Sequence, residues 1–162
     1  MRRAILESLL LMLFLWATPV RAEDKELEWL VVTSDRFSLV VEYPAALFHD
    51  PLMIYSVGDD VWFGPNKDGA ALMISARPAG DQKPYDSVCA LGCLNTVDTV
   101  DKPGVGAVRG QTGNEIYYSE CVLAAGREDG LSKEMHCFHI IYPTSSASMY
   151  NPIVGRMSAT LR

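Results

Sequence analysis

Basic residues are scarce in this chain of 162 residues, which has 14 lysines and arginines against 20 aspartates and glutamates and a formal net charge of −6. Sequence-independent nucleic-acid binding needs a cationic surface that neutralises phosphates, so this acidic balance argues against it. With 49% apolar and 21% charged residues, the composition also excludes a disordered tail, a collagen-like fibre and a dense disulfide scaffold. The length predicts one domain, and the sequence contains no internal repeat, low-complexity stretch or linker.

Long apolar runs are also missing, with one short exception near the start of the chain. Leu9–Ala17 (LLLMLFLWA) is apolar but too short to span a bilayer, which takes about 20 residues. Arg2 and Arg3 precede this run, and a cleavage site with small or apolar residues follows it and ends at Ala22. This three-part pattern predicts a secretory signal peptide over residues 1–22, cleaved after Ala22; the alternative is a retained membrane anchor.

Removal of the signal peptide changes the charge of the remaining chain. It takes away three arginines and one glutamate, which leaves 11 basic and 19 acidic side chains and a net charge of −8 over the 140 residues 23–162. A single domain of this size buries about two thirds of its unfolded surface. The predicted product is a periplasmic domain without a transmembrane segment, whose negative charge favours a cationic protein partner.

The chain has four cysteines, Cys89, Cys93, Cys121 and Cys137, which allow three pairings. An oxidising compartment favours disulfides. Cys89 with Cys93 would close a tight loop, and Cys121 with Cys137 would lie opposite each other in a hairpin around the turn 125–130. The rival interpretation of Cys89 and Cys93 is a metal half-site or a redox pair, but zinc sites and thioredoxin-like sites favour the tighter C-x-x-C spacing. We therefore predict two structural disulfides, with no metal and no cofactor.

Alternation of apolar and polar residues predicts an antiparallel sheet. Phe37, Leu39, Val41 and Tyr43 alternate within Arg36–Tyr43, which is typical of a half-buried strand. Other short runs bounded by turn residues predict further strands, the last two as the arms of the cysteine-containing hairpin. After an apolar run at 28–33, the predicted strands are 36–43, 52–57, 61–64, 70–77, 105–109, 115–124 and 132–142, with a turn at 65–69 and a loop at 101–106.

Helical spacing is found in two longer segments. Apolar residues recur at near-helical intervals within Tyr85–Val97 and again within 145–161. Because proline is tolerated only in a first turn, Pro152 places the start of the second helix near Asn151, a good N-cap. A short helical turn is predicted at Ala45–Asp50. The C-terminal helix should cover one face of the sheet, which gives an α+β fold with an antiparallel sheet flanked by helices.

Three segments carry a resemblance to a known fold: VVEYP (40–44), VWFGPNKDGAALMIS (61–75) and HIIYPTSSASMYNPIVGRMSATL (139–161). In this order they resemble small exported bacterial domains of the PsbP-like fold, an antiparallel sheet flanked by helices, over most of residues 28–161. The resemblance implies protein binding, since known members mostly bind other proteins. One bacterial set with a similar fold acts as immunity proteins that block type VI secretion effectors in the periplasm. Such an analogy of fold is associational.

Catalytic motifs are not found in the sequence. His136 and His139 are three residues apart, so on a strand they point to opposite faces and cannot chelate one ion together. His49 and Asp50 suggest a pair on a surface loop. No serine lies in a G-x-S-x-G elbow, and no pair of carboxylates stands out. We therefore predict no catalytic residues.

Acidic and aromatic residues gather around two turns. Asp68 lies in a turn, Asn66–Gly69, that matches only the end of an EF-hand loop, so solvated turn residues explain it better than a calcium site. Tyr117 and Tyr118 are consecutive, so on a strand one of them should face outward. Tryptophan and acidic side chains near turns are candidates for contact with a partner. The candidate partner-binding residues are Asp59, Asp60, Trp62, Asp68, Glu128 and Asp129.

These features predict a non-enzymatic, exported protein-binding domain, and an inhibitor or immunity role against an envelope-acting effector, such as a type VI secretion toxin, is its sharpest form. Two alternatives remain open. A small exported hydrolase would use a carboxylate or one of His49, His136 and His139. An envelope structural component would form a stable oligomer.

Overall fold

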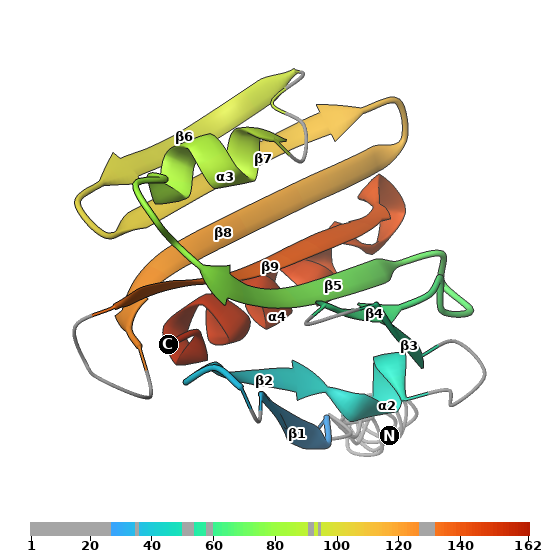
Figure 1. Ribbon diagram of the computed structural model, residues 1–162. Helices are drawn as coiled ribbons and strands as arrows, with labels where there is room; N and C mark the ends of the chain where they lie inside the picture. Colours follow the sequence, from blue (N-terminus) through green and yellow to red (C-terminus); the bar gives the residue numbers. More distant parts are fainter. Residues whose placement is uncertain are drawn as a thin grey trace, which may run out of the picture.

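Two antiparallel sheets form the centre of the computed structural model (Figure 1). The structure describes residues 27–34, 36–49, 54–57, 60–90, 93, 95–126 and 132–162, so the predicted signal peptide lies outside the described residues. Within the described residues, no helix is long and apolar enough to cross a membrane.

The larger sheet has seven strands in the order β3-β4-β5-β9-β8-β7-β6, each antiparallel to its neighbours. The smaller sheet pairs β1 (Trp29–Thr33) with β2 (Val40–Pro44). The strands of the larger sheet are β3 (Ile54–Val57), β4 (Asp60–Phe63), β5 (Ala71–Pro78), β6 (Thr96–Lys102), β7 (Val105–Thr112), β8 (Glu115–Ala125) and β9 (Lys133–Pro143).

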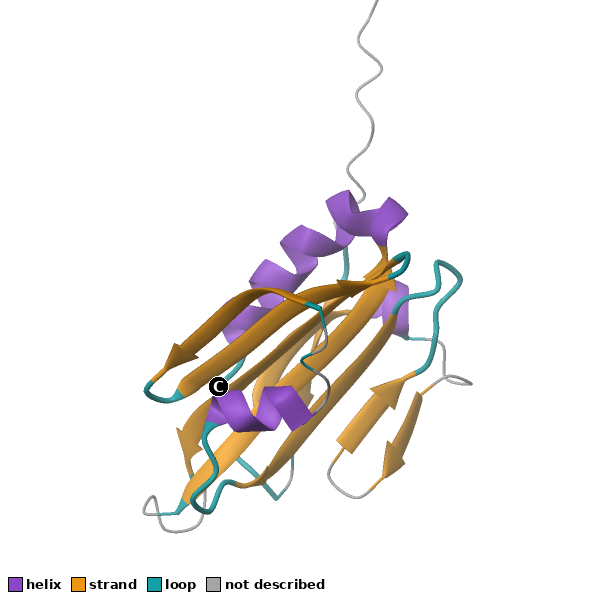
Figure 2. Ribbon diagram, turned by 90° about the horizontal axis from the view of Figure 1, so that it is seen from above, coloured by secondary structure: helices purple, strands orange, loops and turns teal. Residues whose placement is uncertain are grey.

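Helices lie on both faces of the larger sheet, as Figure 2 shows from above. The 3-10 helix η1 (Thr144–Ser146) leads into α4 (Ala147–Thr160), which packs with β2 on one face, called here the α4 face. On the opposite side, the α3 face, α3 (Pro84–Ala90) contacts β6, β7 and β8. The short α2 (Ala45–Phe48) follows β2. The α+β architecture with a C-terminal helix on an antiparallel sheet is thus confirmed.

The α4 face holds the main core, in which residues of β5, β9, β2 and α4 interlock. Phe37, Leu39, Val41 and Tyr43 are all buried there, as their alternation predicts. The strand itself is shorter than expected, because it begins at Val40 instead of Arg36. The Ser34 hydroxyl accepts hydrogen bonds from the backbone N–H groups of residues 36 and 37, at 3.2 and 3.1 Å, and these bonds bend the chain before the strand begins.

A smaller core on the α3 face contains both cysteine pairs. Cys121 and Cys137 lie directly opposite each other on β8 and β9, with an S–S distance of 2.06 Å. Cys89 in the last turn of α3 is paired with Cys93, which lies beyond the end of the helix, with an S–S distance of 2.16 Å. These are the two pairs that the sequence indicated. The buried residues of this core are Ala79, Val88, Val108, Cys121, Met135 and Cys137.

The helix expected over Tyr85–Val97 is too long. In the structure α3 ends at Ala90, and Thr96 already begins β6. The expected loop at 101–106 is also wrong in part, because it is the tight turn of the β6–β7 hairpin, with Gly104 at φ +82°. The start of α3 packs closely on β7, since a Cβ on Gly106 would lie 2.2 Å from the backbone nitrogen of Tyr85.

The C-terminal helix begins four residues earlier than Pro152 indicated. It starts at Ala147, and Pro152 lies inside it. Proline lacks the N–H that a helix interior uses, so one helical hydrogen bond is lost near the first turn. Burial of Tyr150, Ile153 and Met157 in the main core stabilises the helix despite that loss. Asn151 is therefore not an N-cap, and its side chain has another role.

Candidate functional site

A cleft of about 290 Å³ with mixed polar and apolar walls opens on the α4 face where α4 leaves β6 and β7 uncovered. Four strands of the sheet, β6 to β9, supply its floor, and α4 supplies one wall. The lining residues are Asp98, Thr99, Val100, Ala107, Val108, Arg109, Tyr118, Tyr142, Asn151 and Val154.

Strand register places a row of polar side chains on the cleft floor. Asp98 on β6 lies opposite Arg109 on β7, and Arg109 lies opposite Tyr118 on β8. Directly opposite residues of antiparallel strands project to the same face, so these three side chains share the α4 face. The register shifts by one residue between Thr96 and Asp98, which leaves Val97 as a bulge. Bulges re-aim the side chains beside them.

Arg109 is held by α4 rather than by a carboxylate. Its Nη2 donates to Asn151 Oδ1 at 3.3 Å, and the Tyr142 hydroxyl donates to the same oxygen at 2.9 Å. The ion pairs within the described part of the chain join Glu134 to His136 and Glu42 to Arg156, and none includes Arg109. The cleft therefore contains a guanidinium without an acidic partner in the described residues.

Two tyrosines of the cleft keep their protons at neutral pH. Burial raises the pKa of the Tyr118 hydroxyl above its ordinary value of 10.0, and the hydrogen bond and charge of Glu120 raise it further. That hydroxyl donates to Glu120 Oε2 at 2.7 Å. Burial also raises the pKa of Tyr142, against the charge and hydrogen bonding of Arg109, which lower it. Both phenols are thus neutral hydrogen-bond donors with fixed acceptors.

The edge strand β6 borders this cleft. Among the described strands it is paired only with β7, so its outer edge has no strand partner there. Five of its seven residues are exposed, among them Asp98 and Asp101. Val97 is 77% exposed, the largest exposure among the large apolar residues of the described chain. An uncovered edge presents backbone N–H and C=O groups to which another chain can bind.

The residues predicted to bind a partner are not brought together. Asp60 and Trp62 lie on β4 opposite Ser75 and Met73 of β5, on the α3 face. Asp68 lies in the β4–β5 turn at the other end of that strand, where Asn66 Oδ1 accepts from two backbone N–H groups of the turn, each at 3.0 Å. Asp59, Glu128 and Asp129 lie outside the described residues.

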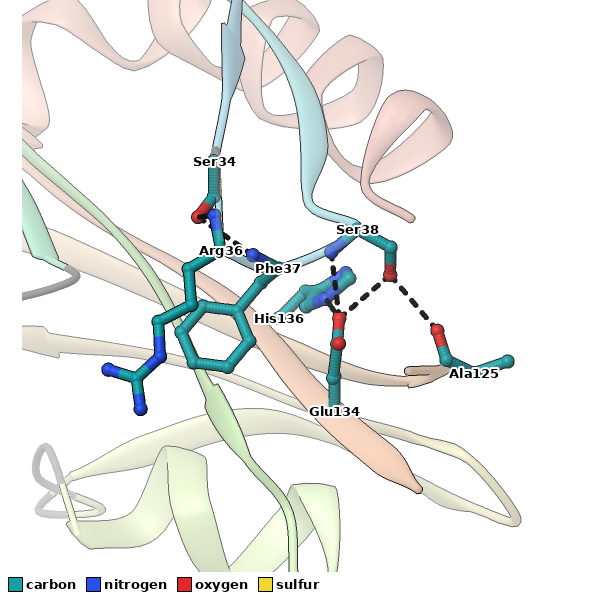
Figure 3. Close-up of polar contacts among 7 residues, drawn as sticks. All are labelled: Ser34, Arg36, Phe37, Ser38, Ala125, Glu134 and His136. Carbon is teal, nitrogen blue, oxygen red and sulfur yellow. Dashed lines mark hydrogen bonds and ion pairs between the residues drawn. The ribbon is translucent and has the colours of Figure 1, made fainter. Parts of the chain in front are cut away.

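A second polar cluster lies buried on the α4 face near the start of β9 (Figure 3). Glu134 Oε2 accepts from the backbone N–H and the hydroxyl of Ser38, both at 2.8 Å, and from His136 Nε2 at 3.0 Å. The Ser38 hydroxyl also lies 3.0 Å from the Ala125 carbonyl oxygen. His136 is fully buried, and its Nδ1 has no hydrogen-bond partner within the described structure. The carboxylate ties the segment before β2 to the sheet, which is a structural role.

The other two histidines also have local partners. His139 Nδ1 is hydrogen-bonded to the Ser119 hydroxyl on the α3 face, opposite to His136 as the strand spacing predicts. Burial lowers the pKa of His139 below its ordinary value of 6.5. Ser119 is 0% exposed, so in this arrangement no substrate reaches its oxygen. His49 Nδ1 lies 3.0 Å from the Tyr43 hydroxyl, and Asp50 lies outside the described residues. No group of three metal-ligating side chains was found in the described segments.

The expectation for Tyr117 and Tyr118 is wrong, because neither faces solvent fully. Tyr118 packs on the main core, and Tyr117 packs on the smaller core and closely covers Gly110. Sequence reasoning also missed Arg109 and Asn151 as a pair. The two are 42 positions apart, and only the register of β7 and the early start of α4 bring them into contact.

Comparison with known proteins adds no assignment. No protein-family model matches the chain, and no curated protein matches it significantly. The resemblance to the PsbP-like fold therefore remains a prediction from the sequence.

Proposed function

We propose that the chain is an exported protein-binding domain that binds an extended segment of its partner along β6. The observation that carries this proposal is the mostly exposed edge strand, whose outer side has no strand partner among the described strands. Strand addition to such an edge provides main-chain hydrogen bonds, and neighbouring pockets provide selectivity.

The charge of the chain favours a cationic partner. Asp98 and Asp101 are exposed along β6. The whole chain has a net charge of −6, and loss of the predicted signal peptide with its three arginines and one glutamate changes this to −8. Complementary charge accelerates association and weakens with salt. Binding should therefore be strongest at low ionic strength.

Export to the periplasm is part of the proposal. The N-terminal pattern of a signal peptide supports it, and so do the two cysteine pairs at disulfide distance, since disulfides persist in oxidising compartments. In its sharpest form the domain is an inhibitor or immunity protein that neutralises an envelope-acting effector. That form predicts that deletion of the gene sensitises the host to attack by its own siblings, and equal survival of the two strains would contradict it.

Site-specific photo-crosslinking in the native host tests the proposed surface. A photoreactive residue in place of Val97 on β6 should give a crosslinked partner. The same residue in place of Val31, which is 54% exposed on the edge strand β1, is the matched control and should give none. Equal crosslinking from both positions, or from neither, would exclude β6 as the docking edge.

Charge reversal separates β6 from the surface that the sequence indicated. The double variant Asp98→Lys/Asp101→Lys should lose the crosslinked partner at low salt. The variant Asp60→Lys/Asp68→Lys changes the net charge equally and should retain it. The opposite result would move the binding site to the β4–β5 hairpin.

A further inference from the structure

The cleft beside α4 has hydrogen-bond donors that no described residue uses. Asn151 Oδ1 accepts from both Tyr142 and Arg109, so the amide oxygen faces these two residues and the amide nitrogen points elsewhere. The Arg109 guanidinium has five N–H donors, more than its hydrogen bonds to Asn151 and Tyr142 occupy. We propose that this cleft binds a carboxylate, independently of the docking of a partner on β6.

The arrangement of Arg109 supports an anionic ligand. Guanidinium groups recognise carboxylates through two parallel hydrogen bonds, and the bond to Asn151 fixes the orientation of the fork. Arg109 is half-buried as a residue, but the bond from its guanidinium to Asn151 is exposed to solvent, so added salt should weaken its attraction for an anion. A ligand carboxylate would thus supply the acidic partner that the described chain does not.

Negative charges in and beside the cleft reduce its affinity for an anion. Asp98 lies across from Arg109 on β6 and repels an approaching anion. Glu120 is buried and accepts a hydrogen bond from the Tyr118 hydroxyl, so it adds negative charge next to the cleft. The site should therefore bind carboxylates modestly and gain affinity when the charge of Asp98 is removed.

The size of the cleft and its apolar residues indicate which group is attached to the ligand carboxylate. The volume of about 290 Å³ lies at the lower limit of cavities that hold small molecules, which run from about 300 to 1,000 Å³. Val100, Ala107 and Val154 provide apolar walls next to the guanidinium. A branched aliphatic acid or the last residue of a peptide chain fits this combination. The two sources share one chemistry, a carboxylate on a small apolar group.

Titration calorimetry with three probes at low salt tests the site. The probes are isovalerate, the dipeptide acetyl-Ala-Val with a free carboxylate, and the same dipeptide as its amide. Binding of both acids without the amide indicates a small-molecule acid, and binding of the dipeptide acid alone indicates a chain terminus. If the amide binds as well as the acid, or if neither acid binds, the proposal is wrong.

Single substitutions locate the binding. Arg109→Gln should weaken the acid probe by about tenfold or more, as expected for loss of charge-assisted hydrogen bonds. Arg77→Gln is the matched control, since Arg77 is exposed on β5 away from the cleft, and it should bind like the unaltered protein. Asp98→Asn should bind more tightly by about two- to fivefold because it removes a repelling charge.

The gain expected from Asp98→Asn keeps the test valid if Arg109→Gln does not fold. Folding of each variant is checked by its circular dichroism and its thermal midpoint. Equal affinity of Asp98→Asn and the unaltered protein, or weaker binding by Arg77→Gln to the same degree as by Arg109→Gln, would show that the acid binds elsewhere. The affinity of a true carboxylate site should also fall as salt is added.

Discussion

The two faces of the larger sheet are stabilised in different ways. On the α4 face, twenty buried residues form one apolar cluster that includes β2, β5, β9 and α4. On the α3 face six of the described residues form the buried cluster, and two of these form a cysteine pair across β8 and β9. Because apolar stabilisation scales with buried area, the smaller cluster needs covalent links that the larger one does not. The following four comparisons of variants measure that difference.

The largest loss is expected from the centre of the α4 face. Phe138 is fully buried there and its ring stacks on that of Tyr118, with centroids 5.6 Å apart. Phe138→Ala should lower the free energy of unfolding by about 4 kcal/mol, measured by urea denaturation. Val97→Ala, at an exposed position, should change it by less than about 0.5 kcal/mol. A small effect of Phe138→Ala would show that the main core is not the principal source of stability.

On the α3 face the link between β8 and β9 should matter more than the link after α3. Removal of Cys121–Cys137 as a double alanine variant should cost about 3 kcal/mol, and removal of Cys89–Cys93 about 2 kcal/mol, because the longer loop restricts the unfolded chain more. The separations are 16 and 4 residues. Urea denaturation of both variants under oxidising conditions measures the order. The reverse order would mean that the Cys89–Cys93 disulfide stabilises the smaller core more than Cys121–Cys137 does.

The buried carboxylate of the α4 face should have an intermediate effect. Glu134→Gln replaces a charged acceptor of three donors by a neutral amide, which weakens the charge-assisted hydrogen bonds, so a loss of about 2 kcal/mol is expected. Ser38→Ala removes only one of these hydrogen bonds and should cost about 1 kcal/mol. If the two variants are equally stable, Glu134 does not anchor the segment before β2.

The smallest effect is a pH dependence on the α3 face. Burial lowers the pKa of folded His139 below 6.5, so the unfolded chain binds more protons in the range between the two values. Stability should therefore fall as the pH falls below 6.5 toward the folded pKa, by at most about 1.4 kcal/mol per pH unit. His139→Gln should remove this part of the profile, whereas His49→Gln should retain it. Identical profiles for His139→Gln and the unaltered protein would contradict the assignment.

The elements that can be predicted from the sequence are those determined by residues close together in the chain. The β8–β9 hairpin was predicted because its arms have β-favouring residues, and the directly opposite Cys121 and Cys137 agree with it. The predicted start of α4 is wrong because the rule for Pro152 considers only neighbouring residues. The burial of Tyr150 and Ile153 depends on a sheet formed by distant parts of the chain. The predicted end of the helix over Tyr85–Val97 is wrong for a similar reason, since Thr96 pairs with Gly110 of β7, a contact that helical spacing does not show.

The candidate site depends almost entirely on tertiary contacts. Arg109 and Asn151 have no sequence pattern in common, and Asn151 was interpreted as a helix cap. Asp98 could be predicted as a site residue only if the helix over Tyr85–Val97 were predicted to end before Thr96. In that case β6 would be recognised as an edge strand. Register and edge position decide both proposed surfaces, and neither is encoded by a local motif.

The backbone contacts between Val40 and Arg162 bear on the order in which the molecule assembles. The two residues exchange hydrogen bonds of 2.8 and 3.1 Å, and Glu42 on β2 is bonded to Arg156 and Thr160 of α4. A chain that emerges from the ribosome or a translocation channel N-terminus first therefore delivers β2 more than a hundred residues before the helix that covers it. The apolar side of the β1–β2 hairpin stays without its packing surface during that interval. A chaperone that recognises extended apolar segments would have its best opportunity then, and residues 29–44 are where it should bind.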